Sequence, residues 1–202
     1  SHFSLISYLA SALPARGDDV RHDLREGTYF CLSASGLPVS MPKGQWDGEM
    51  TRLVRALKAG GLQAVLVAKD PWCLPLEEVA RRTGSLYFGP NHEFHDLWPL
   101  FKSASFLVSG HYHYVIFGAM VGCPFIPLSV NNHKMKGVCE HLAWQRSEPF
   151  DATLLRFCRD EIVEEAQSLV RDRPRLSTHL RERAATLRGE AFRLGKRVAE
   201  VT

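Results

Sequence analysis

Short apolar runs alternate with segments of helical periodicity through the first three quarters of the chain. The apolar runs are too short for helices and predict buried strands at residues 28–33, 63–68, 86–88, 105–109 and 125–128. Apolar positions three and four residues apart predict helices at residues 46–59, 76–83, 94–102 and 112–121. This alternation predicts an α/β fold with a Rossmann-like parallel sheet and helices on both faces. The strands at 106–109 and 125–128 are continuously apolar, so we expect them to be adjacent and central.

After Pro149 the pattern becomes helical, which predicts a Rossmann-like domain at residues 1–150 and C-terminal helices at residues 151–202. Asp151 can cap a first helix, and Pro174 is expected to separate it from a second. We expect the second helix to lie on an apolar surface, in this chain or outside it. Its apolar stripe consists of Leu176, Leu180, Ala184, Leu187, Ala191, Leu194 and Val198. A further short helix is predicted at residues 3–13.

Composition and charge narrow the class of protein. The 202 residues are 45% hydrophobic, which is enough for one sizeable core. The net charge of +3 is concentrated in residues 171–202, where nine Lys or Arg face four Asp or Glu. We interpret this surplus as a solvated or partner-facing helix and expect no nucleic-acid partner. No apolar run is long enough to span a membrane, and five widely spaced cysteines favour free thiols and a cytoplasmic setting.

Polar and basic residues follow two neighbouring strands of the predicted sheet. After the strand at 105–109 come Gly110, His111, Tyr112 and His113, at the start of an apolar helix. A helix N-terminus offers free N–H groups to an anion, and glycine permits close backbone approach. The loop after the next strand carries Asn131, Asn132, His133 and Lys134. Because carboxyl ends of parallel strands meet at one edge, we expect an anion site there.

Metal binding and cysteine catalysis are weaker interpretations of the same residues. The spacing of the histidines lacks a carboxylate or cysteine at a typical zinc interval, and NHEFH is not HExxH. No cysteine lies at a strand-to-helix turn, where a nucleophile would be expected. We therefore expect no metal and no cofactor. The histidines considered are His92, His95, His111, His113 and His133.

The run FLVSGHYHYVIFGAMVGCPFIPLSVNNHKMKG resembles the C-terminal half of the polysaccharide pyruvyl transferase family. That family shows a strand, Ser-x-Arg-Leu-His, an apolar helix ending in Gly-x-Pro, a second strand, and a loop before Lys-x-x-Gly. The matching positions here are Ser109, His113, Gly122, Pro124, Lys134 and Gly137. The family's Arg and Leu are replaced by His111 and Tyr112. The resemblance implies one half of a GT-B-type architecture, with the acceptor-binding first half absent from this chain.

The resemblance implies transfer of a pyruvyl group from phosphoenolpyruvate, or another anionic donor, to a glycan acceptor. His113 would be the catalytic acid or base, and the isolated domain would be inactive without its first half. Two alternatives remain open: a nucleotide-sugar-dependent GT-B glycosyltransferase domain, and a non-catalytic GT-B-like binding module. The residues implied in substrate binding are Gly110, His111, Tyr112, Asn132 and Lys134, with Ser35 and Gly36 lining the same site beside Ser33.

Overall fold

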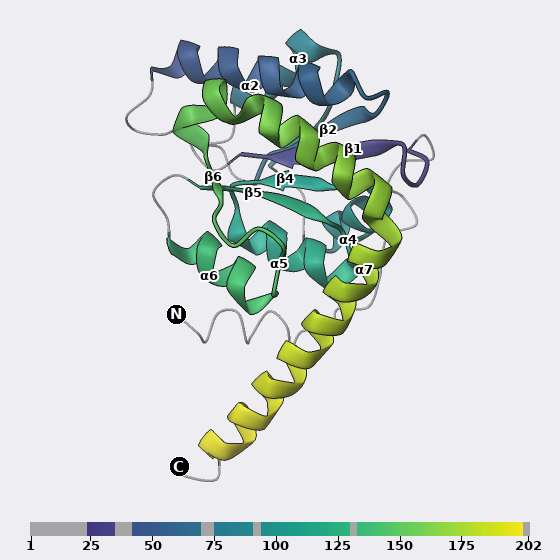
Figure 1. The fold of residues 1–202 in the computed structure, drawn as a ribbon, viewed down its shortest axis with the longest axis vertical. Coiled ribbons are helices and arrows are strands. Elements are labelled where there is room, and N and C mark those ends of the chain that lie inside the picture. The colour runs from purple at the N-terminus through teal and green to yellow at the C-terminus, as the bar shows by residue number, and fades with distance from the viewer. Residues whose placement is uncertain (1–23, 35–41, 70–74, 91–93, 130–132, 200–202) are drawn as a thin grey trace.

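Six parallel strands form one sheet in the computed structural model, which describes residues 24–34, 42–69, 75–90, 94–129 and 133–199 (Figure 1). Their order across the sheet is β3-β2-β1-β4-β5-β6, the order of a doubly wound Rossmann sheet. The predicted fold class is therefore confirmed. The strands are β1 Tyr29–Ser33, β2 Gln63–Val67, β3 Leu86–Phe88, β4 Leu107–Ser109, β5 Phe125–Ser129 and β6 Phe150–Asp151.

The two most apolar strands, β4 and β5, are adjacent and interior, as predicted. β4 pairs with β1 on one side and with β5 on the other, and β5 lies between β4 and β6. Both strands are buried along their length, apart from the last residue of β5. The short strand β6 was not predicted, because two residues carry no periodic signal.

Helices cover both faces of the sheet (Figure 1). One face carries α2 Lys43–Lys58, α3 Pro75–Thr83 and the first half of α7 Leu155–Ala199. The other carries α4 Phe94–Ser103, α5 Tyr112–Val121 and α6 His133–His141. The prediction that residues 131–134 form a loop is wrong for His133 and Lys134, which begin α6. Its apolar positions Met135, Val138 and Cys139 are buried, as is Leu142 directly after it, so the sequence shows the spacing of a helix.

Helix α5 is buried on nearly every side, and glycines allow its close packing. A Cβ atom on Gly118 would lie 3.3 Å from the Leu107 side chain of β4. Gly122 ends the helix with a φ of 80°, as its position in the sequence predicted. A Cβ atom on Gly122 would also lie 2.8 Å from the carbonyl oxygen of Ser177, because α7 crosses α5 there. Both the conformation and the crossing therefore require glycine at residue 122.

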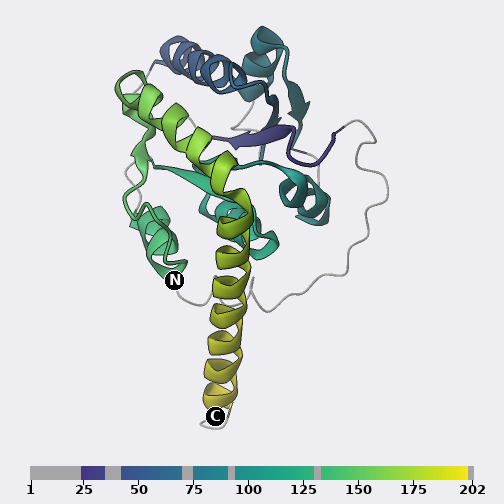
Figure 2. The same ribbon diagram turned by 45° about the vertical axis from the view of Figure 1, so that its right-hand side comes forward.

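Helix α7 runs without a break from Leu155 to Ala199, so the prediction that Pro174 separates two helices is wrong. Packing on both sides of the proline holds the helix together despite the lost backbone hydrogen bond. The neighbouring Arg173 donates hydrogen bonds to the carbonyl oxygens of Ala104 and Lys102 and pairs with Glu26. Figure 2 shows a change of direction about midway along α7, as expected for a helix that contains proline.

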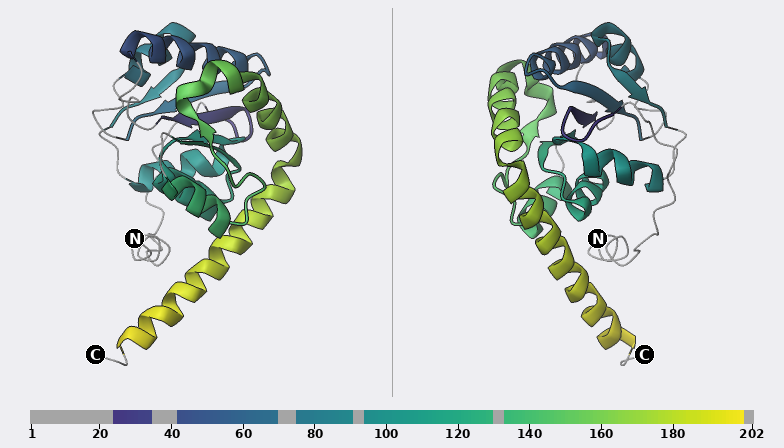
Figure 3. Two further views of the ribbon diagram at one scale, coloured as in Figure 1. Left: turned by 60° about the vertical axis from the view of Figure 1, so that its left-hand side comes forward. Right: turned by 90° about the vertical axis from the view of Figure 1, so that its right-hand side faces the viewer.

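The apolar stripe of α7 is buried over the part whose side chains are described. Leu176, Leu180 and Leu187 belong to the main core cluster, and Ala184 and Ala191 are also buried. Leu194 and Val198 lie in the last turns of α7, where the side chains are not described, and the predicted helix at 3–13 lies outside the described residues. The last part of α7 extends beyond the sheet and its covering helices (Figure 3). Upstream, Asp151 accepts a hydrogen bond from the Thr153 N–H and so caps the 3₁₀ turn that leads into α7.

Candidate functional site

The start of α5 is shaped by hydrogen bonds to two neighbouring strands. The Gly110 N–H donates to the carbonyl oxygen of Ser33 at 2.9 Å, which ties the turn to the end of β1. The Ser109 hydroxyl oxygen accepts a hydrogen bond from the His111 N–H at 3.0 Å and donates one to the His111 carbonyl oxygen at 3.1 Å. These bonds fix the N-terminus of α5 at the carboxyl edge of the sheet.

Three of the four ring side chains at the start of α5 remain partly accessible. His111, Tyr112 and His113 are half-buried, whereas Tyr114 is buried and packs edge-on against Phe101. The rings of Tyr112 and His113 are tilted by 34° to one another, with 3.9 Å between their centroids. Tyr114 is therefore a core residue, whereas the other three rings are partly exposed at this edge of the sheet.

The N-terminus of α6 lies beside that of α5, because β4 and β5 are neighbours in the sheet. The Lys134 ammonium group, in the first turn of α6, lies 5.5 Å from the centre of the Tyr112 ring. Neither α5 nor α6 has an acidic residue in its first turn, and α6 begins with His133 and Lys134. Basic residues at a helix N-terminus oppose the helix dipole, so a bound anion would stabilise this arrangement.

His113 sits in an electropositive environment. Burial is the main cause that lowers its pKa to about 4, and the positive charges of Lys69 and Lys134 contribute to the same shift. The imidazole is therefore neutral at pH 7, able to donate one hydrogen bond and accept another. Lys69, just after β2, was missed in the sequence; a lysine directly after an apolar strand was the available signal. Gly110, His111, Tyr112, His113, Lys69 and Lys134 are called the carboxyl-edge cluster below.

Ser33 adds a buried polar atom at this edge of the sheet. It is fully buried at the end of β1, and its hydroxyl makes no hydrogen bond within the described residues. Its register partner is Ser109 of β4, so the two side chains point to the same face of the sheet. The other residues predicted for this site, Ser35, Gly36 and Asn132, lie outside the described ranges.

Metal binding and cysteine catalysis have little support in the residues that the structure describes. No group of three or more His, Cys, Asp or Glu side chains in that part of the chain could hold a metal ion. The cysteines Cys31, Cys123, Cys139 and Cys158 are free. Burial raises the pKa of Cys123 to about 12, so it is no nucleophile at neutral pH. Among the described helices, none is long and apolar enough to cross a membrane.

The parallel sheet with its two helical layers and the long C-terminal helix defines one half of a GT-B-type architecture. The trehalose-6-phosphate synthase OtsA matches with a TM-score of 0.55 and 10% identity, over 100% of this chain and 50% of that one. An OtsA apo structure matches with a TM-score of 0.54 and 12% identity, over 96% of this chain and 48% of that one. A trehalose-6-phosphate structure from E. coli bound with UDP-2-fluoro glucose matches with a TM-score of 0.51 and 12% identity, over 96% of this chain and 46% of that one.

This chain thus spans about half the length of the solved chains it matches. At such low identity the likeness defines the fold alone. No protein-family model matches the sequence. No curated protein matches it either.

Proposed function

We propose that this chain is the donor-binding half of a GT-B-type glycosyltransferase, and that the carboxyl-edge cluster binds the diphosphate of a nucleotide sugar. One observation carries the proposal: two adjacent helix N-termini meet there with Lys69 and Lys134. A helix N-terminus alone stabilises an exposed anion by about 0.3–1 kcal/mol. Useful affinity therefore needs the two lysines as well, whose charge-assisted hydrogen bonds contribute about 1.5–3 kcal/mol each when desolvated.

The number and spread of the positive groups favour a diphosphate over a single phosphate. They come from three places: the end of β2 and the N-termini of α5 and α6, which follow β4 and β5. In the sheet, β1 separates β2 from β4, so the three places are spread along the edge. An extended anion can contact all three, whereas one phosphate cannot span them as well. The E. coli structure that shares this fold is bound with UDP-2-fluoro glucose, which supports a nucleotide sugar as the donor.

His113 would serve this site as a neutral hydrogen-bonding group. With a pKa of about 4 in the ligand-free protein, it carries no charge at pH 7. Its ring can hydrogen-bond a phosphate oxygen or a sugar hydroxyl, and a bound anion would offset the two lysine charges and raise its pKa. We propose His113 as the residue that contacts the donor next to the bond to be broken.

Pyruvyl transfer from phosphoenolpyruvate is the second candidate, favoured by the spacing of Ser109, His113, Gly122, Pro124, Lys134 and Gly137. That reaction needs a general acid to protonate the vinyl carbon. A His113 pKa of about 4 leaves very little of the acid form at pH 7. Together with the UDP-2-fluoro glucose bound in the E. coli structure that shares this fold, this property of the ligand-free protein ranks pyruvyl transfer behind glycosyl transfer.

Calorimetric titrations of the chain with UDP-glucose, UDP, phosphoenolpyruvate and inorganic phosphate at pH 7.5 test the proposal. We expect UDP and UDP-glucose to bind at least about tenfold more tightly than phosphate, a difference of about 1.4 kcal/mol. Tighter binding of phosphoenolpyruvate than of UDP would favour pyruvyl transfer. No binding of any of the four would favour the non-catalytic module.

A further inference from the structure

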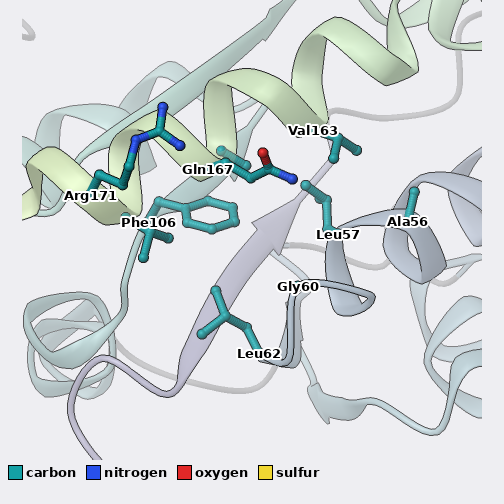
Figure 4. A pocket seen from close by; sticks show the side chains of 10 residues that line it. Ala56, Leu57, Gly60, Leu62, Phe106, Val163, Gln167 and Arg171 are labelled. Carbon is teal, nitrogen blue, oxygen red and sulfur yellow. The ribbon is translucent and has the colours of Figure 1, made fainter.

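A second candidate site lies at the opposite, amino edge of the sheet. A pocket of about 270 Å³ opens there between the C-terminal end of α2 and the first half of α7 (Figure 4). Its walls include Leu62, which directly precedes β2, and Phe106, which directly precedes β4. The carboxyl-edge cluster lies beyond the other ends of the same strands, so the two sites are separate.

The interior of this pocket is apolar and well supported. Phe106 is buried and stacks on Phe30 of β1, with 5.1 Å between the ring centroids, so it forms a fixed floor. Leu57 and Leu62 line one side, and Val170 of α7 remains 40% exposed at the pocket. An engineered apolar cavity of about 150 Å³ binds benzene. A space of this size therefore suits one ring with a short side chain.

Two polar side chains of α7, Gln167 and Arg171, lie one helical turn apart and border the apolar space. Arg171 is exposed and makes no ion pair with any residue that the structure describes. Figure 4 shows it on the Phe106 side of the pocket, away from Ala56 and Gly60. The end of α2 is already capped, since the Gly60 and Gly61 N–H groups donate to the carbonyl oxygens of Leu57 and Lys58. Arg171 therefore provides a cation for a ligand's anionic group on the side away from the α2 carbonyls.

We infer that this pocket binds a small monocarboxylate with a single ring or a short branched chain. The apolar body fills the space over Phe106, and the carboxylate contacts Arg171 and the Gln167 amide. This site is independent of the proposed sugar-nucleotide site and would exist whichever transfer reaction the chain supports.

Protein NMR titrations of the full 202-residue chain with phenylacetate test this inference. We expect saturable shifts at Leu62, Phe106 and Val170. The neutral analogue phenylacetamide should bind about two- to fivefold more weakly, the size expected for one exposed ion pair. Arg171→Gln should remove that difference, whereas Arg175→Gln, one turn further along α7 and outside the pocket, should preserve it.

Ala166→Phe fills the pocket and should abolish the chemical-shift changes. If this variant does not fold, the comparison of acid and amide binding in Arg171→Gln still tests the inference. Absence of saturable shifts in the wild type would overturn the inference. Equal binding of acid and amide would overturn the role of Arg171. A wild-type dimer that dissociates on Ala166→Phe would assign the pocket to a second copy of the chain instead.

Discussion

His113 is the residue on which the chemistry of the carboxyl-edge cluster depends, and its environment follows from both local and distant sequence. The strand end, Gly110 and the start of α5 are contiguous, so His111, Tyr112 and His113 could be assigned to one site from the sequence. Lys69 follows an apolar strand, but its approach to His113 could not be inferred, because it depends on how β1 joins β2 to β4 in the sheet. Sheet order is a long-range property that periodicity does not encode.

The pKa of His113 gives a prediction at this scale. We expect NMR titration of its ring protons to give a pKa near 4, and Lys134→Met and Lys69→Met each to raise it by removing a positive charge. Lys102→Met, at the amino edge of the sheet, is the control and should leave it unchanged. A His113 pKa near the ordinary value of about 6.5 in the wild type would contradict this environment.

The same shift predicts how stability depends on pH. The unfolded chain binds a proton on this histidine at a pKa of about 6.5, the folded chain only near 4. Between these values the unfolded state holds more protons, so the free energy of unfolding falls as the pH falls from about 6.5 to 4. Urea unfolding of the wild type and of His113→Gln at pH 7.5 and 5 should show a smaller loss in the variant. An equal loss of unfolding free energy in both proteins would contradict a contribution of His113 to the pH dependence.

At the scale of elements, the crossing of α5 and α7 shows what local pattern can and cannot predict. The sequence predicted both the end of a helix at Gly122 and the apolar stripe of α7. The continuation of α7 through Pro174 was not, because the local cost of proline is outweighed by packing on either side, including the contacts of Arg173. α6 was missed because its first residues were interpreted only as basic loop residues.

Gly122→Ala tests this crossing. The substitution forces alanine into a left-handed conformation, at about 1–2 kcal/mol, and places its Cβ atom 2.8 Å from the Ser177 carbonyl oxygen. We expect the free energy of unfolding to fall by at least that amount. Gly189→Ala is the matched control, since no atom lies within 4 Å of its Cβ position in α7, and it should stabilise by about 0.5–1 kcal/mol. Equal effects would show that the two helices do not cross as described.

The apolar stripe of α7 gives a further test by denaturation. Leu180 is fully buried in this chain, so Leu180→Ala should lower the free energy of unfolding by about 2–5 kcal/mol. Phe192, on the same helix but 53% exposed, serves as the comparison, and Phe192→Ala should cost much less. A negligible effect of Leu180→Ala would mean that the stripe is not packed on this chain.

At the scale of the whole molecule, the alternation of strands and helices was enough to predict the fold class. It did not predict the strand order, the strand β6, or the juxtaposition of the α2 end with α7 that forms the amino-edge pocket. The motif at residues 106–137 pointed to a GT-B-type half, and the fold matches half of OtsA. The choice between glycosyl and pyruvyl donors depends on the carboxyl-edge cluster rather than on the architecture.

The most direct test of the central claim is calorimetric titration of UDP-glucose into the wild type and three variants. Lys69→Met, Lys134→Met and the control Lys102→Met change the net charge equally, but only the first two alter the carboxyl-edge cluster. We predict a loss of affinity of about tenfold for each of these two, or about 1.4 kcal/mol, and none for Lys102→Met. Equal affinities in all four proteins would contradict a diphosphate site at this edge of the sheet.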